Sequence, residues 1–405
     1  MNKFRITVLL IILTFVGFGQ SNESDLLERF VACDTSLTNF EVMDLIHTYK
    51  SSLKPKDADH LFEKLQRLAK DSLFEEIETV CLQILKENPL SFTANTYYTI
   101  SLLELGKMNN LKSSRNKSRM IYKAVKKFGS GKESSPYYIG NLSDAKTMIF
   151  FYWQDGVKID SIVQSENKVS NIYITNAKKK NEIVSFDFFE SASIRDVYFD
   201  YHRDFQYYSA ESKKPESKYN YNALLKRFET EDKLLKNNEI IALMIGFTNN
   251  QNYLPYKNIS IERKIMDLVS KKDYHKSLKL CDDFLITNPL NFTAIMEKGY
   301  CLMKIKNDKS QFPSLKSRML VDAILWSGNG SFLNPYFVLS PIDGQTIISY
   351  IFGGDIGTMG SADDTNGYFL DILEIQKEGQ KPRNIHFNID HATNVLMKQI
   401  EKAID

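Results

Sequence analysis

The spacing of apolar residues changes from a helical to a strand-like pattern along the second half of the chain. Between residues 261 and 303, apolar side chains recur every three or four positions, which is the period of an amphipathic helix. The Asn288-Pro289 step predicts the end of one helix, because proline disfavours helical geometry in the residue before it. After Gly328 the spacing shortens, and residues 384–389 alternate strictly between polar and apolar. Helices followed by strands indicate an α+β fold.

The first half of the chain carries the same order of patterns because the two halves are copies. Residues 81–94 read CLQILKENPLSFTA and residues 281–294 read CDDFLITNPLNFTA, so eight of the 14 positions are identical, where chance gives about one. The LLERF at residues 26–30 likewise matches LLKRF at residues 224–228, with an offset of 198. Matches that keep their order along the chain indicate a tandem duplication.

These patterns predict two α+β units joined by a linker. The first unit is expected over residues 20–190, with helices over 25–128 and strands over 135–190. The polar SAESKKPESK stretch places a linker over residues 191–220, whose aromatic residues are expected to pack on the neighbouring units. The second unit is expected over residues 221–405. Its parts are helices over 221–327, strands over 334–390, and a closing helix over 391–403 capped by Asp390.

Each unit is expected to end in a small antiparallel β meander. Pro341-Ile342-Asp343-Gly344 is a turn sequence, and it predicts a hairpin between strands at residues 336–339 and 346–351. The corresponding strand of the first unit is expected at residues 148–153. Packed on helices, such a meander gives the segregated layers of an α+β domain.

Two resemblances rest on these motifs. Tyr274, Ser277, Cys281, Leu285 and Pro289 stand where a tetratricopeptide-type hairpin places its aromatic, small, bulky, apolar and proline positions. This resemblance covers one or two hairpins in each unit and implies stacked helix pairs without implying a ligand.

The second copy also resembles a family of exported bacterial proteins known as domain of unknown function 4919. The shared features are LLKRF, the YLPY step at residues 253–256, the helix that ends in Asn-Pro, the Gly-Asn-Gly turn at 328–330 and IHFNID at 385–390. The resemblance covers about residues 221–390 and, through the duplication, 26–190. Leu53 and Lys56 stand in the first copy for Tyr253 and Tyr256. The family resemblance implies the α+β architecture and supplies no catalytic residue, substrate or cofactor.

The first residues predict export. Lys3 and Arg5 precede an uncharged apolar run over residues 6–18, and a small residue, Gly19, precedes Gln20. This order is typical of a signal peptide over residues 1–19, cleaved between Gly19 and Gln20, and the run is too short for a membrane span. The alternative is an uncleaved membrane anchor. We expect a periplasmic or secreted protein.

The remaining composition excludes some partners. The chain has 52 Lys and Arg against 50 Asp and Glu, so its charge gives no sign of nucleic-acid binding. No stretch after the signal peptide is apolar enough to cross a membrane. We therefore expect a globular protein whose partner is an unknown protein or another component of the cell envelope.

No sequence motif identifies a catalytic, cofactor or metal site. The chain lacks a GxSxG elbow, a phosphate-binding loop and a zinc spacing. Cys33, Cys81, Cys281 and Cys301 are expected to be buried free thiols, with disulfides as the alternative. His386 and His391 flank Asp390, but exposed or capping histidines explain this spacing better than a metal site does.

One glycine-rich segment, residues 353–367, contains four hard oxygen ligands: Asp355, Asp363, Asp364 and Asn366. Calcium prefers such ligands, but the spacing fits no EF-hand, and a flexible connection between strands is the simpler interpretation. We therefore expect no cofactor. The sequence favours a non-catalytic binding or scaffold protein; the alternative is an enzyme, of hydrolase type, with an unrecognised site. A concave pocket that holds two or more titratable groups within hydrogen-bond reach would favour the enzyme, whereas a shallow groove lined with tyrosines would favour binding.

Overall fold

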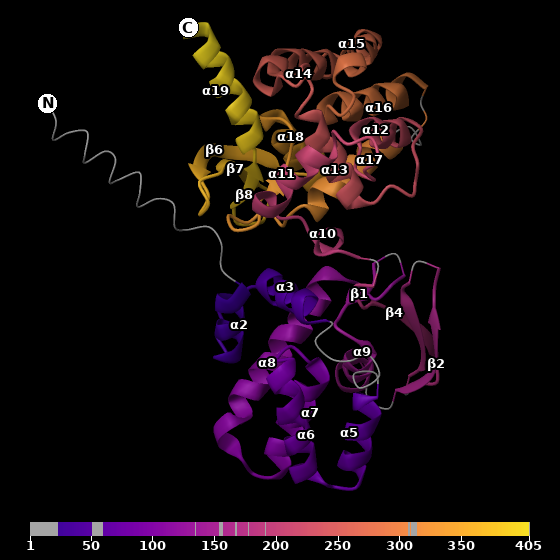
Figure 1. Cartoon of the computed structure of the whole chain (residues 1–405). Helices are drawn as coiled ribbons and strands as arrows, with labels where there is room; N and C mark the ends of the chain where they lie inside the picture. Colours follow the sequence, from indigo (N-terminus) through magenta and orange to yellow (C-terminus); the bar gives the residue numbers. More distant parts are fainter. Residues whose placement is uncertain are drawn as a thin grey trace, which may run out of the picture. The chain divides into compact units, whose positions relative to one another are not determined.

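The computed structural model describes residues 23–50, 60–133, 135–153, 157–166, 168–176, 178–190, 192–306, 308 and 314–404. It divides into two compact units, of which the first ends at Val197 and the second begins at Tyr198 (Figure 1). Each unit has a helical part followed by a four-stranded sheet, so the duplicated α+β architecture is confirmed.

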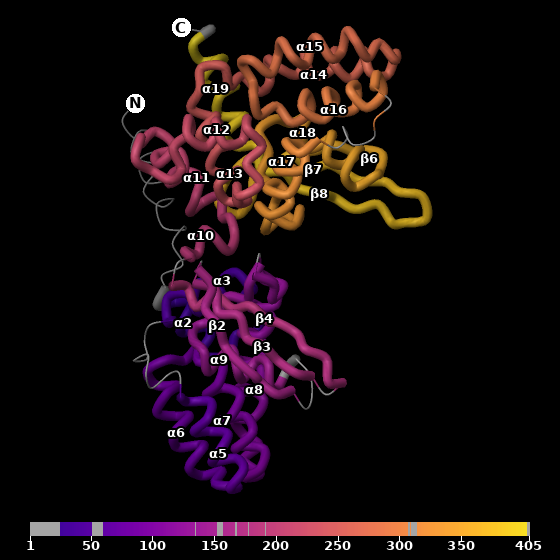
Figure 2. The backbone as a smooth tube through the Cα atoms, turned by 90° about the vertical axis from the view of Figure 1, so that its right-hand side faces the viewer, coloured from indigo at the N-terminus to yellow at the C-terminus, as the bar shows by residue number. Residues whose placement is uncertain are grey.

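Six described helices in the helical part of each unit correspond in chain order. In the first unit they are α2 (Glu23–Val31), α3 (Asn39–Tyr49), α5 (Leu61–Lys70), α6 (Phe74–Glu87), α7 (Phe92–Glu104) and α8 (Met108–Phe128). Their counterparts are α12 (Tyr221–Glu229), α13 (Asn237–Phe247), α14 (Pro255–Ser270), α15 (Tyr274–Thr287), α16 (Phe292–Lys306) and α17 (Leu315–Trp326). The Asn-Pro steps end α6 and α15 as expected, and α5, α6 and α7 lie side by side in Figures 1 and 2.

The sheets also correspond. The first contains β1 (Tyr137–Tyr138), β2 (Lys158–Gln164), β3 (Ser170–Thr175) and β4 (Asn181–Asp187), in the order β1-β4-β3-β2. The second contains β5 (Tyr336–Phe337), β6 (Asp355–Asp363), β7 (Phe369–Gln376) and β8 (Arg383–Asn388), in the order β5-β8-β7-β6. The last three strands of each sheet form the expected antiparallel meander, whereas the short first strand pairs in parallel with the last.

The prediction of a β hairpin around residues 341–344 is wrong. These residues begin a helix, α18 (Pro341–Thr346), which continues as the π-helix η3 (Ile347–Phe352). Ser340 and Asp343 form a capping box and Pro341 occupies the first turn, and this combination starts a helix rather than a β turn. In the first unit α9 (Leu142–Met148) and η1 (Ile149–Trp153) likewise replace the strand expected at residues 148–153.

The prediction of a linker over residues 191–220 is also wrong, because most of this segment is folded. It contains α10 (Ile194–Val197) and α11 (Tyr201–Glu211), and α11 packs on α13 (Figure 2). Phe199, Tyr208 and Tyr219 are buried in the core of the second unit. Only the turn over residues 213–216 is exposed along its whole length.

The acidic glycine-rich segment is mostly a strand. Its residues 355–363 form β6, which pairs with β7, so the expected flexible connection is confined to the turn after Asp363. There the Asp364 carboxylate accepts hydrogen bonds from the Asn366 and Tyr368 N–H groups, at 2.8 and 2.9 Å. These contacts are those of an ordinary polar turn.

The closing helix α19 (Asp390–Ile404) is present. Asp390 does not act as the expected N-cap of this helix and binds other groups instead. Its carboxylate accepts the Phe369 N–H of β7 at 3.2 Å and the Asn394 amide at 2.9 Å, which ties the helix to the sheet. All four cysteines are free; Cys33 is partly exposed, and the other three are buried as expected.

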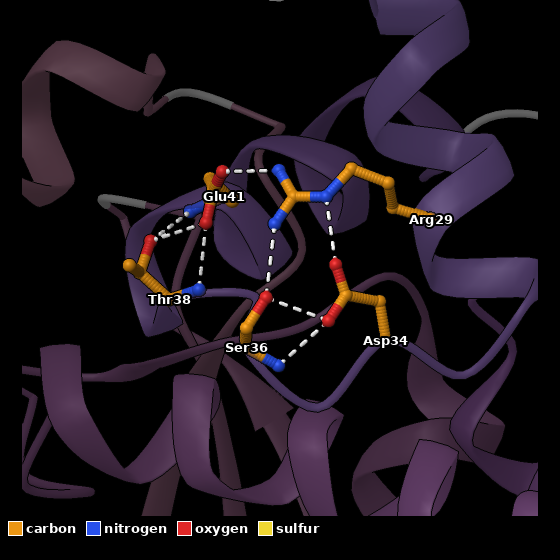
Figure 3. Close-up of polar contacts among 5 residues, drawn as sticks. All are labelled: Arg29, Asp34, Ser36, Thr38 and Glu41. Carbon is orange, nitrogen blue, oxygen red and sulfur yellow. Dashed lines mark hydrogen bonds and ion pairs between the residues drawn. The ribbon is translucent and has the colours of Figure 1, made fainter.

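An ion-pair network at the start of each unit is kept in both copies. Arg29 contacts Asp34 and Glu41, both at 2.9 Å, and Glu41 also accepts the Thr38 N–H in a capping box (Figure 3). In the second unit Arg227 makes the same two contacts with Asp232 and Glu239, both at 2.7 Å. Because this network joins α2 to α3 and α12 to α13 in the same way, we attribute it to the fold.

Candidate functional site

The polar groups that differ between the copies identify a candidate site in the second unit. Some buried polar contacts are shared: the Thr93 and Thr147 hydroxyls are 2.9 Å apart, and those of Thr293 and Thr346 are 2.8 Å apart. Asp144 and Asp343 also correspond, each as the buried acid in the first turn of α9 or α18. Around Asp343, however, the second unit has a second buried carboxyl group that no described residue of the first unit provides around Asp144.

This second group is Glu262 on α14, whose side chain is fully buried. An offset of 200 relates the two units in this region, since Leu65 of α5 corresponds to Ile265 of α14 and Cys81 of α6 corresponds to Cys281 of α15. The same offset aligns Glu262 with Phe62, a core residue that packs on Tyr97 and Phe150. A carboxyl group therefore stands in the second unit where the first has an aromatic ring.

Glu262 and Asp343 line a small pocket, which we call the Glu262 pocket. Its other lining residues are Phe247, Tyr253, Pro255, Asn258, Asn288, Asn291, Leu339 and Ser340. Its volume of about 20 Å³ is enough for one or two groups the size of water. Asn258 and Asn291 are partly exposed, whereas the two carboxyl groups are buried.

Both oxygens of Glu262 have hydrogen-bond donors within the pocket. The Asn291 side-chain amide donates to Oε1, and the Ser340 hydroxyl lies 3.4 Å from Oε2. The second of these contacts is long, so Oε2 retains capacity for a further donor. Asn291 also accepts the Ala294 N–H through its carbonyl oxygen and so caps α16. The N-terminus of α16 thereby fixes the amide that holds Glu262.

Asp343 is satisfied on one side only. Its Oδ2 accepts the Leu339 and Ser340 N–H groups, at 3.1 and 2.9 Å, and these bonds hold the carboxyl group at the start of α18. Its Oδ1 is buried and has no hydrogen-bond partner among the described residues. The equivalent carboxylate of Asp144 has both oxygens engaged, by Thr93 N–H at 2.8 Å and by the Asn141 amide at 3.0 Å.

Burial favours the protonated forms of both acids in the Glu262 pocket. It raises the pKa of Glu262 to about 7, in spite of the hydrogen bonds from Asn291 and Ser340. Burial and the nearby Glu262 carboxyl together raise the pKa of Asp343 well above its ordinary value. Because the charge of Glu262 affects the protonation of Asp343, the two carboxyl groups titrate as a pair.

Tyr253 closes one side of the pocket. It is buried, and its hydroxyl donates a hydrogen bond of 2.7 Å to the Leu339 carbonyl. Tyr256, the other tyrosine of the YLPY step, lies 3.2 Å from the Thr393 hydroxyl on α19. The two tyrosines therefore have separate roles. Their first-copy counterparts, Leu53 and Lys56, lie outside the described residues.

The histidines and cysteines considered from the sequence do not form a site. His391 is buried among Phe205, Phe337 and Tyr253, and burial lowers its pKa to about 3. This contradicts the expected exposed or capping histidine. His386 contacts the Gly330 carbonyl at 3.1 Å instead.

Burial also raises the thiol pKa of Cys81 and of Cys281, which opposes formation of the reactive thiolate. Within the described ranges, no three His, Cys, Asp or Glu residues are placed to hold a metal ion.

Sequence patterns alone do not reveal the Glu262 pocket, although the sequence contains a signal for it. The sequence places Asp343 in a predicted turn, and Glu262 is one acid within an amphipathic helix. Aligning the copies at an offset of 200 places Glu262 against Phe62, and an acid that replaces a core aromatic residue marks the position.

The proposed cleavage site, Gly19 and Gln20, lies outside the described residues. Among the helices of the described part, none is long and apolar enough to span a membrane.

The two copies are matched by one family model. The model of the family described as domain of unknown function (DUF4919) matches residues 20–210 and again residues 206–398. The chain belongs to this family. The two DUF4919 matches cover both units and meet at α11, and they confirm the tandem duplication. The description of the family names no activity. Comparison with curated proteins and with solved structures gives no match.

Proposed function

We propose that this protein is an exported, non-catalytic binding protein of the cell envelope, and that its second unit binds a small ligand in the Glu262 pocket. The observation that carries the proposal is the pair of buried carboxyl groups in a pocket where one oxygen has no hydrogen-bond partner among the described residues. Burying an additional acid costs stability, and such a cost is characteristic of functional sites. The first unit, with Phe62 at this position, supports the scaffold and lacks the site.

Binding explains the pocket better than hydrolysis does. Two acids of raised pKa in one pocket are the arrangement that would favour an enzyme, since one could act as acid and the other as base. A volume of about 20 Å³, however, leaves no room for a scissile bond and an attacking water together with both carboxyl groups. Asp343 Oδ2 is moreover fixed by two backbone N–H groups as a helix cap. The pocket therefore suits a single small group that enters and leaves unchanged.

A ligand screen of the mature chain, residues 20–405, tests the proposal. Thermal unfolding is followed with small amines, amides, sugars, carboxylic acids and divalent cations. At least one compound should raise the midpoint for the parent chain and not for Glu262→Gln, because the variant keeps the shape of the side chain and removes its charge.

The first copy provides the matched control for this screen. Asp144→Asn alters the first-copy counterpart of Asp343 and should leave the ligand effect intact. Binding without turnover is checked by NMR of the recovered compound. Three results would each contradict the proposal: no effect from any class, an effect unchanged in Glu262→Gln, or chemical conversion of the compound.

Export is tested separately by N-terminal sequencing of the protein recovered from the periplasm or medium. A chain that begins at or near Gln20 supports the proposed compartment. An intact Met1 in the membrane fraction would refute it.

A further inference from the structure

We propose that the Glu262 pocket binds a primary ammonium group, R–NH3⁺, between the carboxyl groups of Glu262 and Asp343. This inference rests on the proposed binding function and names the chemistry of its ligand. The geometry that supports it is the set of acceptor atoms left free in the pocket, together with the small volume available.

The free atoms of the pocket are mainly acceptors. Within the described part of the chain, Asp343 Oδ1 is buried without a hydrogen-bond partner, and Glu262 Oε2 has only the Ser340 hydroxyl, at 3.4 Å. The Leu339 carbonyl, which accepts the Tyr253 hydroxyl, has a second lone pair. Three acceptors match the three N–H donors of a primary ammonium group, and a water-sized volume matches its head.

The charge of the pocket favours the same ligand. Among the described residues that line it, none is a lysine, arginine or histidine, so neither acid has a cationic partner there. The other titratable group in the lining is Tyr253; burial raises its pKa, and the nearby Tyr201 and Tyr256 contribute to the rise. A cation that enters would pair with carboxylates that otherwise remain protonated, and charge-assisted hydrogen bonds of this kind are among the stronger ones in proteins.

A metal ion fits less well. Calcium takes six to eight oxygen ligands, and two of the four carboxylate oxygens already accept N–H donors from Leu339, Ser340 and Asn291. The ammonium group needs only the oxygens that remain. Its organic substituent would leave between Asn258 and Asn291, the partly exposed residues of the lining.

The acids couple ammonium binding to pH. Because burial raises the pKa of both groups, a cation binds by displacing protons from them. Affinity should then rise with pH, by about tenfold per pH unit below pH 7 for each proton released. A neutral ligand that accepts hydrogen bonds from the protonated acids would show the opposite trend or none.

The experiment uses the mature chain, residues 20–405, with methylammonium chloride as the probe and its methyl signal observed by NMR. Saturation transfer and titration at pH 8 should show binding, which should weaken about tenfold or more in Glu262→Gln. Asp144→Asn, which changes the first-copy counterpart of Asp343, should leave binding unchanged. Tetramethylammonium, which carries the same charge without N–H donors, should not bind or compete.

Two sources of the ammonium group are distinguished by a second probe, Nα-acetyl-lysine methylamide. Binding as tight as that of methylammonium, or tighter, supports a lysine side chain of a polypeptide as the source. Binding more than about tenfold weaker supports a free amine. In either case, binding of the probe must weaken in Glu262→Gln for the result to support this pocket.

The proposal is overturned if methylammonium fails to bind, if tetramethylammonium or potassium competes equally, or if Glu262→Gln binds as the parent does. Circular dichroism checks that the variant folds, and Glu262→Asp, which keeps the charge and shortens its reach, provides a second test if it does not. If only a neutral compound from the thermal screen binds with sensitivity to Glu262→Gln, the ammonium inference fails while the binding function stands. If no compound binds, both fail.

Discussion

Helix α11 belongs to the core of the second unit, so removing it should destabilise that unit strongly. The comparison is between residues 198–405, which contain α11, and residues 219–405, which begin two residues before the start that the sequence predicts for the unit, residue 221. The shorter fragment lacks Phe199 and Tyr208, which are 4% and 0% exposed. It also lacks Tyr201 and Phe205, which pack on the same core.

The size of the effect follows from these buried aromatic residues. Replacing one buried aromatic side chain by alanine costs about 3–5 kcal/mol, so losing two costs about 6 kcal/mol or more. A typical domain has a free energy of unfolding of about 5–15 kcal/mol, so the shorter fragment should be marginal. With a urea dependence of about 2 kcal/mol per molar, the midpoint should fall by about 3 M.

Urea unfolding of both fragments, followed by circular dichroism and tyrosine fluorescence, measures this difference. Residues 198–405 should give one coincident sigmoidal transition in both signals, as a two-state domain does. Residues 219–405 should unfold at much lower urea or without cooperativity. Midpoints within about 0.5 M of each other would show that α11 is a dispensable linker and that its place in the core is wrong.

Three further predictions concern single sites. Cys81→Ser and Cys281→Ser should each lower the free energy of unfolding by about 1–3 kcal/mol, because a hydroxyl replaces a buried thiol, whereas partly exposed Cys33→Ser should change it little in the same urea melt. Limited trypsin digestion should cut first after exposed Lys213. The two products should still co-elute in gel filtration, because α11 stays packed on α13. First cleavage within residues 278–303, or separation of the products, would contradict this prediction. Between about pH 4.5 and 7, the unfolded chain releases the Glu262 proton that the folded chain keeps. The free energy of unfolding should therefore fall by up to about 3 kcal/mol as pH rises through this range, and it should fall less in Glu262→Gln. Parallel pH profiles of the parent and the variant would refute this prediction.

The helical parts could be predicted because their signals are local and occur twice. Cys81 and Cys281 lie at equivalent apolar positions of α6 and α15, and both are fully buried. The Asn-Pro steps end these helices through backbone geometry that depends on neighbouring residues alone. A duplicated chain also supplies its own comparison, which strengthens each such assignment.

The parts that could not be predicted depend on competition or on distant contacts. Pro341 and Gly344 suit a turn as well as the start of a helix, and the Ser340–Asp343 capping box decides for the helix. The pairing of β5 with β8 joins residues about 50 positions apart, and no local pattern encodes it. The polar residues after α11 suggested a linker, while the burial of Tyr208 depends on the core around it.

The candidate site was hidden for a related reason. The chemistry of Glu262 comes from its burial beside Asp343, and burial is a property of the folded unit. Only the alignment with Phe62 carries a trace of it in the sequence.

The protonation of Glu262 in the folded, ligand-free chain tests the account most directly, because the site exists only if this carboxyl group is buried beside a second one. Carbon-13 NMR of the side-chain carboxyl groups across the pH range measures it, with the signal assigned by its loss in Glu262→Gln. We predict a titration midpoint near pH 7, since burial raises the pKa of Glu262 to about 7. A midpoint near 4.5, the ordinary value for glutamate, would show a solvated carboxylate and contradict the site.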